Sequence, residues 1–206
     1  MTGSVTVIDY GAGNLRSVVN AISSVGYSAK VTDKPADILS AEVLILPGVG
    51  SAGATMKSLQ ELGLIQPIRD YIAEDKPFFG ICIGMQVLLS EAEEGGRQSC
   101  LDVIEGNVKM LKAQGLKIPH IGWNQVNLKE THPAFNDITN GSNFYFVHSY
   151  YTEPLDENLV LGTTEYGMAF PSVIHRGRLL ATQFHPEKSG TIGLKLYANF
   201  LNEAFG

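Results

Sequence analysis

The sequence has few charged residues, few cysteines and no long hydrophobic run. Charged residues make up 17% of its 206 residues, whereas soluble domains average about 25%. The 15 Lys and Arg residues are outnumbered by 21 Asp and Glu residues and form no basic cluster, which argues against binding to nucleic acid or to an anionic membrane surface. Apolar runs such as 43–46 are far shorter than the roughly 18 residues of a membrane span. We therefore expect small molecules or another protein as partners.

The two cysteines, Cys82 and Cys100, belong to no CxxC pair of the kind that binds zinc or exchanges disulfides. Residues 1–9 lack the basic region, apolar stretch and cleavage site of a secretory signal. We therefore expect a cytoplasmic protein whose thiols stay reduced. The glycines in 11–14 lack the third glycine of a dinucleotide-binding loop, and the histidines show no metal-ligand spacing. We expect no metal and no cofactor.

Short apolar strands alternate with helical patterns in the first half of the chain, which is typical of an α/β fold with a mainly parallel sheet. The patterns predict strands at 5–9, 43–46, 78–81 and 179–184, and helices at 15–25, 54–71, 85–89 and 192–204. Breaks are expected near Gly63 and Pro67 in the second helix. Between 100 and 178, turn signals such as Asn140-Gly141 and Arg176-Gly177 separate shorter strands and indicate an antiparallel region. No linker interrupts the pattern, so we predict a single domain, 1–206, of flavodoxin-like architecture.

Cys82 lies in a G-x-C-x-G motif between a predicted strand and a predicted helix, which is the pattern of a nucleophile elbow. Gly80 and Gly84 permit a strained turn that raises the central side chain above the sheet, and the N-terminus of the next helix favours a thiolate. A buried structural thiol is the alternative for a lone cysteine. We predict that Cys82 is a nucleophile.

His185-Pro186-Glu187 follows the last predicted strand. Residues i and i+2 of an extended chain point to the same side, so the Glu187 carboxylate can orient the His185 imidazole as the third member of a triad does. An ordinary turn is the alternative. Cys82 and His185 support each other, because both are expected at the carboxyl ends of neighbouring strands, where sites form in doubly wound sheets.

A glycine-rich loop, Pro47-Gly48-Val49-Gly50, follows the strand predicted at 43–46. Its glycines allow the backbone to approach a ligand and to direct an N–H group at a developing oxyanion. The second donor of such an oxyanion hole would be the N–H of Ile83, which follows the nucleophile. A tight turn without function is the alternative for this loop.

Together the strings 80–86, 185–187 and 47–50 resemble the triad, or class I, glutamine amidotransferases, which hydrolyse glutamine to glutamate and ammonia. The strings 8–15, 47–51, 119–124, 148–151 and 184–189 resemble the glutaminase subunit of imidazole glycerol phosphate synthase across the whole chain. The resemblance implies catalysis by Cys82, His185 and Glu187. It also implies that glutamine is held by Gln86, Glu94, Ser149, Tyr150 and the backbone of Gly50.

The same resemblance implies a heterodimer with a (β/α)8-barrel cyclase subunit, which would use the ammonia. Asn14, Trp123 and Lys188 match positions on the side of that partner. Many class I members have a Gly-Gly pair where Val49 separates Gly48 from Gly50. A β-branched residue resists a positive φ, so we expect the loop to rest with its N–H group turned away and to flip only when the cyclase is docked and occupied by its ligand. The isolated subunit should then be a poor glutaminase.

Three alternatives remain open from the sequence. A glutaminase subunit of another synthase, such as pyridoxal phosphate synthase, would share the triad but should lack the strings 9–15 and 122–124. A stand-alone cysteine hydrolase would work without a partner. A flavodoxin-like interaction module would carry Cys82 only as a buried thiol.

Overall fold

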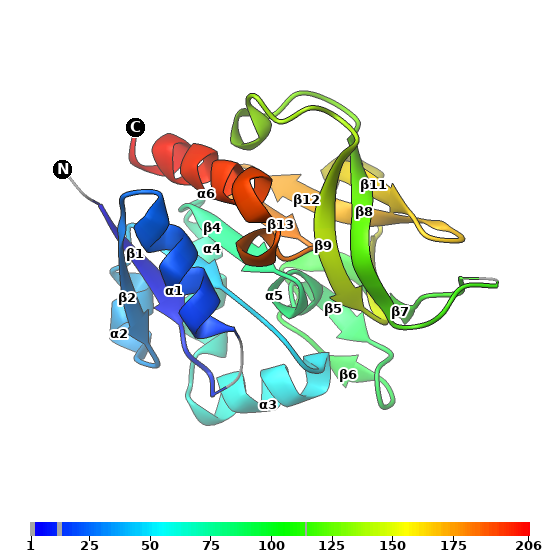
Figure 1. The fold of residues 1–206 in the computed structure, drawn as a ribbon. Helices are drawn as coiled ribbons and strands as arrows, with labels where there is room; N and C mark the ends of the chain where they lie inside the picture. The colour runs from blue at the N-terminus through cyan, green and yellow to red at the C-terminus, as the bar shows by residue number, and fades with distance from the viewer. Residues whose placement is uncertain (1–2, 12–13, 114) are drawn as a thin grey trace.

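The computed structural model describes residues 3–11, 14–113 and 115–206, so Ala12 and Gly13 of the predicted N-terminal loop lie outside it. The described residues form a nine-stranded and a four-stranded sheet with helices on both sides of the larger one (Figure 1). The larger sheet contains β1 (Ser4–Ile8), β2 (Ser28–Thr32), β3 (Val43–Leu46), β4 (Phe78–Ile81), β8 (His120–Leu128), β9 (Ser142–His148), β11 (Val160–Glu165), β12 (Ala169–Arg176) and β13 (Leu179–Thr182). The smaller sheet contains β5 (Leu89–Ala92), β6 (Gln98–Ser99), β7 (Ile104–Met110) and β10 (Tyr150–Pro154).

The α-helices of the described ranges alternate with strands in the first half of the chain, except for the last helix, which follows the final strand. They are α1 (Leu15–Ser24), α2 (Pro35–Leu39), α3 (Ala52–Glu61), α4 (Ile65–Ala73), α5 (Ile83–Gln86) and α6 (Gly190–Phe205), with 3-10 turns η1 (Pro133–Phe135), η2 (Glu157–Leu159) and η3 (Pro186–Lys188). Among the residues that the structure describes, no helix is long and apolar enough to cross a membrane.

One half of the larger sheet is parallel and has the strand order β2-β1-β3-β4-β13. This is the order of a flavodoxin-like sheet. Every residue of β3, β4 and β13 is buried, because α1 and α6 cover one face and α2 and α4 the other (Figure 1). The carboxyl ends of β3, β4 and β13 therefore lie side by side, and the three predicted site motifs follow these ends.

The other half of the larger sheet continues beyond β13 with β12, β11, β8 and β9, all paired antiparallel. The predicted antiparallel region thus extends the central sheet. Its other two strands, β7 and β10, join β5 and β6 in the smaller sheet, where β5 pairs parallel with β7. The turns predicted at Gly141 and Gly177 are confirmed, because both glycines have a positive φ, +78° and +57°.

Two local predictions were wrong. The helix expected at 85–89 is α5, which ends after Gln86, and the chain turns into β5 because the backbones of 87–89 pair with 101–104. A short run that is apolar on every side cannot be told apart as helix or strand from its periodicity. The break near Gly63 is present, but α4 runs through Pro67, because a proline in the first helical turn removes no intrahelical hydrogen bond.

Candidate active site

The turn at Cys82 has the backbone that the G-x-C-x-G motif predicts. Cys82 has φ +54° and ψ −106°, a conformation that non-glycine residues rarely adopt. A Cβ atom at Gly84 would lie 1.9 Å from the Leu46 carbonyl oxygen, and one at Gly80 would lie 2.8 Å from the Gly84 oxygen. The requirement for glycine on both sides of the cysteine is therefore confirmed. The Cys82 N–H donates to the Thr182 oxygen at 2.7 Å, which ties the turn to β13.

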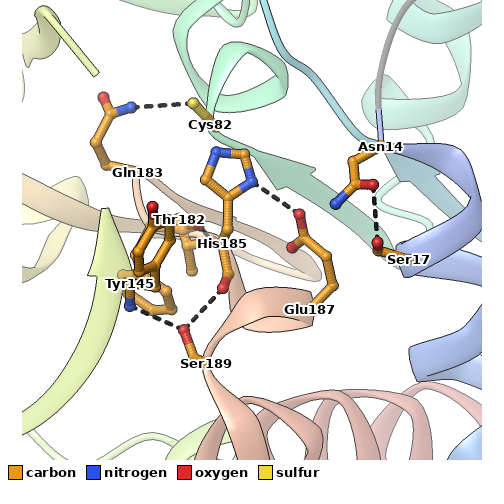
Figure 2. A network of polar contacts seen from close by, with 10 residues as sticks. Asn14, Ser17, Cys82, Tyr145, Thr182, Gln183, His185, Glu187 and Ser189 are labelled. Carbon is orange, nitrogen blue, oxygen red and sulfur yellow. Dashed lines mark hydrogen bonds and ion pairs between the residues drawn. The ribbon is translucent and has the colours of Figure 1, made fainter. Parts of the chain in front are cut away.

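His185 and Glu187 form a buried pair directly after β13. The His185 Nδ1 and a Glu187 carboxylate oxygen are 2.8 Å apart, and both side chains are 1% exposed. The two groups therefore lie together, as expected from their i, i+2 spacing. The chain between them is not extended as predicted, because Pro186 and Glu187 belong to the 3-10 turn η3. Figure 2 shows the other ring nitrogen, Nε2, facing Cys82. Among the described residues, Nε2 has no hydrogen-bond partner.

The charge balance around His185 favours the protonated imidazolium. Burial alone would lower its pKa, but the negative charges of Cys82 and Glu187 outweigh burial and raise the pKa to about 10. The ring therefore carries a proton at neutral pH and lies between the Cys82 sulfur and the Glu187 carboxylate. This arrangement can supply a proton to a leaving group bound near the sulfur.

Strand β9 fixes the backbone of His185. The His185 N–H donates to the Tyr145 oxygen at 2.9 Å. The Ser189 hydroxyl accepts from the Tyr145 N–H at 3.0 Å and donates to the His185 oxygen at 2.7 Å (Figure 2). The Tyr145 ring also packs edge-on against Trp123, with centroids 6.0 Å apart. The antiparallel half of the sheet thus positions a group that follows the parallel half.

A cavity of about 340 Å³ opens over Cys82, within the size range of small-molecule sites. It is lined by ten residues predicted from the sequence, Val49, Gly50, Cys82, Ile83, Gln86, Glu94, Ser149, Tyr150, His185 and Lys188, and by Pro119, Val147 and His148. Gly48 lies behind this wall, where a Cβ atom would be 2.6 Å from the Ile83 Cβ. The structure therefore brings the predicted nucleophile, base and glutamine-contacting residues around one cavity.

Two polar side chains on the cavity wall already have partners. The buried Gln86 amide donates to the Tyr150 oxygen at 2.8 Å and to the Gln183 side-chain oxygen at 3.1 Å. The Glu94 carboxylate accepts from the Ala52 N–H at 3.1 Å, at the start of α3. Because α3 directly follows the loop that contains Val49, this hydrogen bond ties Glu94 to the end of that loop.

The residues predicted to face a partner have different surroundings. Trp123 is 57% exposed on β8, beside Ile121, which is 59% exposed. Lys188 is exposed at the rim of the cavity. Asn14 is half-buried, accepts a hydrogen bond from Ser17 at 2.8 Å, and lies beyond Glu187 in Figure 2.

Sequence reasoning missed Gln183. Its side-chain amide nitrogen donates to the Cys82 sulfur over 3.6 Å (Figure 2). The available signal was a polar residue in the otherwise mainly apolar run 179–184, two positions before His185 and therefore on the same side of the chain. The other thiol, Cys100, is different, because burial and the nearby Glu91 charge raise its pKa to about 11, as in an unreactive structural cysteine.

The chain matches a known protein family over most of its length. The family model "Glutamine amidotransferase class-I" matches residues 6–204. The chain belongs to the class I glutamine amidotransferases. Within the family it groups with imidazole glycerol phosphate synthase subunits HisH. It is 52% identical over 202 residues to that subunit from Dehalococcoides mccartyi, covering 98% of both chains, and 53% identical over 200 residues to that from Chloroflexus aurantiacus, covering 96% and 94%.

A solved structure shares the fold of this amidotransferase at low sequence identity. A putative GMP synthase subunit from Thermoplasma acidophilum superimposes with a TM-score of 0.73 at 18% identity, covering 100% of this chain and 95% of the other. Such identity supports the architecture alone. The predicted fold class is confirmed by this match and by the family model.

Proposed function

We propose that this chain is the glutaminase subunit of an imidazole glycerol phosphate synthase and that Cys82, His185 and Glu187 hydrolyse the carboxamide of L-glutamine. The observation that carries the proposal is the buried His185–Glu187 pair, 2.8 Å long, facing a cysteine on a strained turn at the cavity. The high identity to HisH subunits over the whole chain supports the assignment to this synthase.

In the first step, the Cys82 thiolate attacks the carboxamide carbon and forms a tetrahedral intermediate. The His185 imidazolium gives its proton to the nitrogen, the C–N bond breaks, and ammonia leaves a thioester on Cys82. The oxyanion would be held by the Ile83 N–H and by an N–H group of the loop at 48–50, which both border the cavity.

In the second step, the thioester is hydrolysed. Formation of the thioester removes the negative charge on Cys82 that helps to raise the His185 pKa. The neutral ring then takes a proton from water, whose oxygen attacks the thioester carbon. The C–S bond breaks, Cys82 leaves as the thiolate and His185 keeps its proton, which restores the starting pair. The new carboxyl group loses the second proton of the water to solvent and leaves as glutamate. Glu187 orients the ring in both steps.

The released ammonia would pass to a (β/α)8-barrel cyclase subunit in a cytoplasmic heterodimer. That subunit would use it to make imidazole glycerol phosphate and an aminoimidazole carboxamide ribotide in histidine biosynthesis. The exposed Ile121 and Trp123 on β8 support a docking surface, because large apolar side chains are typical of interface centres.

The test is Cys82→Ala in complex with the cyclase. We expect glutamine-dependent synthesis to be lost and synthesis from added ammonia to be retained, because only the glutaminase step needs the sulfur. Cys100→Ala is the matched control and should retain both. Loss of both activities in Cys82→Ala would contradict the division of labour, and retention of both would contradict a nucleophilic role.

A further inference from the structure

A continuous series of hydrogen bonds joins strand β8 to the sulfur of Cys82. In order, the contacts are Asn124 Nδ2 to His120 Nε2 at 3.3 Å, His120 Nδ1 to His148 Nε2 at 3.0 Å, His148 Nδ1 to the Tyr150 oxygen at 2.9 Å, Gln86 Nε2 to the same oxygen at 2.8 Å, Gln86 Nε2 to Gln183 Oε1 at 3.1 Å, and Gln183 Nε2 to Cys82 Sγ at 3.6 Å. Of these residues, the proposed glutaminase site uses only Cys82, Gln86 and Tyr150. We refer to the series as the β8 relay.

The β8 relay has one self-consistent arrangement of hydrogens. A carbonyl oxygen can only accept, so the His148 Nδ1 must carry the hydrogen that is donated to Tyr150. In the neutral ring, His148 Nε2 then accepts from His120 Nδ1, and His120 Nε2 accepts from the Asn124 amide. Asn124 uses its second amide hydrogen for the Glu165 oxygen at 2.8 Å.

The surroundings of the two histidines keep them neutral. His120 stacks between Phe146 and Tyr166, with centroid distances of 4.9 and 4.0 Å, and both histidine side chains are buried. Burial lowers the pKa of His120 to about 4 and that of His148 to about 3. Protonation of either ring would place two donors face to face within the relay, so the neutral state is also the only one compatible with its contacts.

The same reasoning fixes the two glutamine amides. Gln86 uses both amide hydrogens, for Tyr150 and for Gln183. The Gln183 oxygen is therefore the acceptor, and its amide nitrogen faces Cys82 and donates to the sulfur. A hydrogen-bond donor aimed at a sulfur stabilises the thiolate relative to the thiol.

We propose that Gln183 is a further catalytic residue that holds the Cys82 thiolate through its amide N–H, and that the His120–His148 pair positions it from strand β8. The proposal rests on the proposed function, because it assigns a role in activating that nucleophile. Trp123 neighbours Asn124 on β8 and is exposed, so a partner docked there lies on the strand where the relay begins.

The direct test is Gln183→Glu, with Gln183→Met as a neutral second variant. Glutamate keeps the size and the acceptor for Gln86 but places a negative oxygen at the sulfur, and methionine removes both polar groups. We expect kcat for glutamine hydrolysis to fall about ten- to hundred-fold in both, with little change in KM. The pH profile for alkylation of Cys82 by iodoacetamide, followed by mass spectrometry, should move to higher pH. If both variants have the kcat and the alkylation pH profile of the wild type, the proposed role of Gln183 is overturned.

A matched pair of variants tests the positioning histidine. Asparagine places its amide near the Nδ1 position of a histidine, and glutamine places it near Nε2. His148→Asn can therefore keep the bond to Tyr150, whereas His148→Gln keeps only the contact with His120. We expect kcat to be several-fold higher in His148→Asn than in His148→Gln. Equal losses of kcat in the two variants would overturn the positioning role of the His120–His148 pair.

Cys82→Ala, assayed in parallel, separates the two proposals. If Cys82→Ala is inactive with glutamine while the Gln183 variants behave as wild type, only the inference about Gln183 fails. If Cys82→Ala still hydrolyses glutamine, both fail. Synthesis from added ammonia in the complex should be retained by every variant, which shows that each is folded and docked.

Discussion

The two halves of the larger sheet hold their histidines in opposite states. In the parallel half, His185 follows β13 between two negative groups, which raise its pKa to about 10. In the antiparallel half, His120 and His148 have no carboxylate partner among the described residues, and burial lowers their pKa values to about 4 and 3. We propose that the parallel half carries the group that moves a proton, and that the antiparallel half carries neutral groups that position the cavity wall.

The largest expected effect is on kcat, when Glu187 loses the charge that orients His185. Glu187→Gln keeps the shape of the side chain but removes the charge that orients and stabilises the imidazolium. We expect kcat for glutamine hydrolysis to fall about a thousand-fold or more, measured as glutamate release in the complex. Glu157→Gln, on the exposed η2 turn, is the matched control and should be unaffected. A loss of less than about ten-fold would show that the buried pair has little part in catalysis.

The two halves should also differ in their tolerance of an added methyl group. At Gly84 the new Cβ would lie 1.9 Å from a backbone oxygen, which cannot move away, whereas at Gly162 its nearest contacts are side-chain methyls at 3.1 and 3.2 Å. We expect Gly84→Ala to lower the free energy of unfolding by about 3 kcal/mol or more and Gly162→Ala by about 1 kcal/mol. Denaturant unfolding measures both, and equal losses would contradict the packing described for the elbow.

On the antiparallel half, Trp123 offers a test of partner binding. Trp123→Ala removes a large exposed ring from the proposed docking surface, so we expect the Kd for the cyclase to rise about ten- to hundred-fold. Calorimetry of the glutaminase with the cyclase measures this constant. Leu155→Ala, at a residue that is 63% exposed outside β8, is the matched control. If both substitutions change the Kd equally, the β8 surface is not the docking site.

The smallest effect is a difference in titration between the halves. Because the pKa of His185 is raised, its stabilising contribution is complete below about pH 6.5 and is lost as the pH rises towards about 10. The lowered pKa values of His120 and His148 act in the other direction and reduce stability as the pH falls from about 6.5. NMR titration of the imidazole resonances should find His185 charged at pH 8 and the other two neutral at pH 5.5. A charged His148 at pH 5.5 would contradict the relay.

The features that could be predicted from the sequence are those that depend on short stretches of chain. The Cys82 turn depends on glycines two positions away, and the His185–Glu187 contact depends on i, i+2 spacing. Both geometries are present, while the catalytic roles remain predictions. In the described part of the chain, four of the five strands in the parallel half of the larger sheet could be predicted because burial gives them apolar runs. Strand β2 was missed because most of its residues are exposed and its sequence is not an apolar run.

The rest depends on contacts between distant residues. The contact of Gln183 with Cys82 joins positions 101 apart, and that of Gln183 with Gln86 joins positions 97 apart, so no local pattern reveals them. The helix expected at 85–89 was wrong for the same reason, because pairing with 101–104 decides where the chain leaves α5. The arrangement of His120 and His148 follows from the pairing of β8 with β9.

The most direct test of the central claim compares glutaminase activity in the free subunit with that in the complex loaded with the cyclase ligand. If the antiparallel half and its partner control chemistry on the parallel half, the free subunit should hydrolyse glutamine slowly. The rate in the ligand-loaded complex should be about ten- to hundred-fold higher. The Gln183→Glu variant should retain docking but reach a lower rate. Equal rates in the loaded complex and in the free subunit would contradict the account.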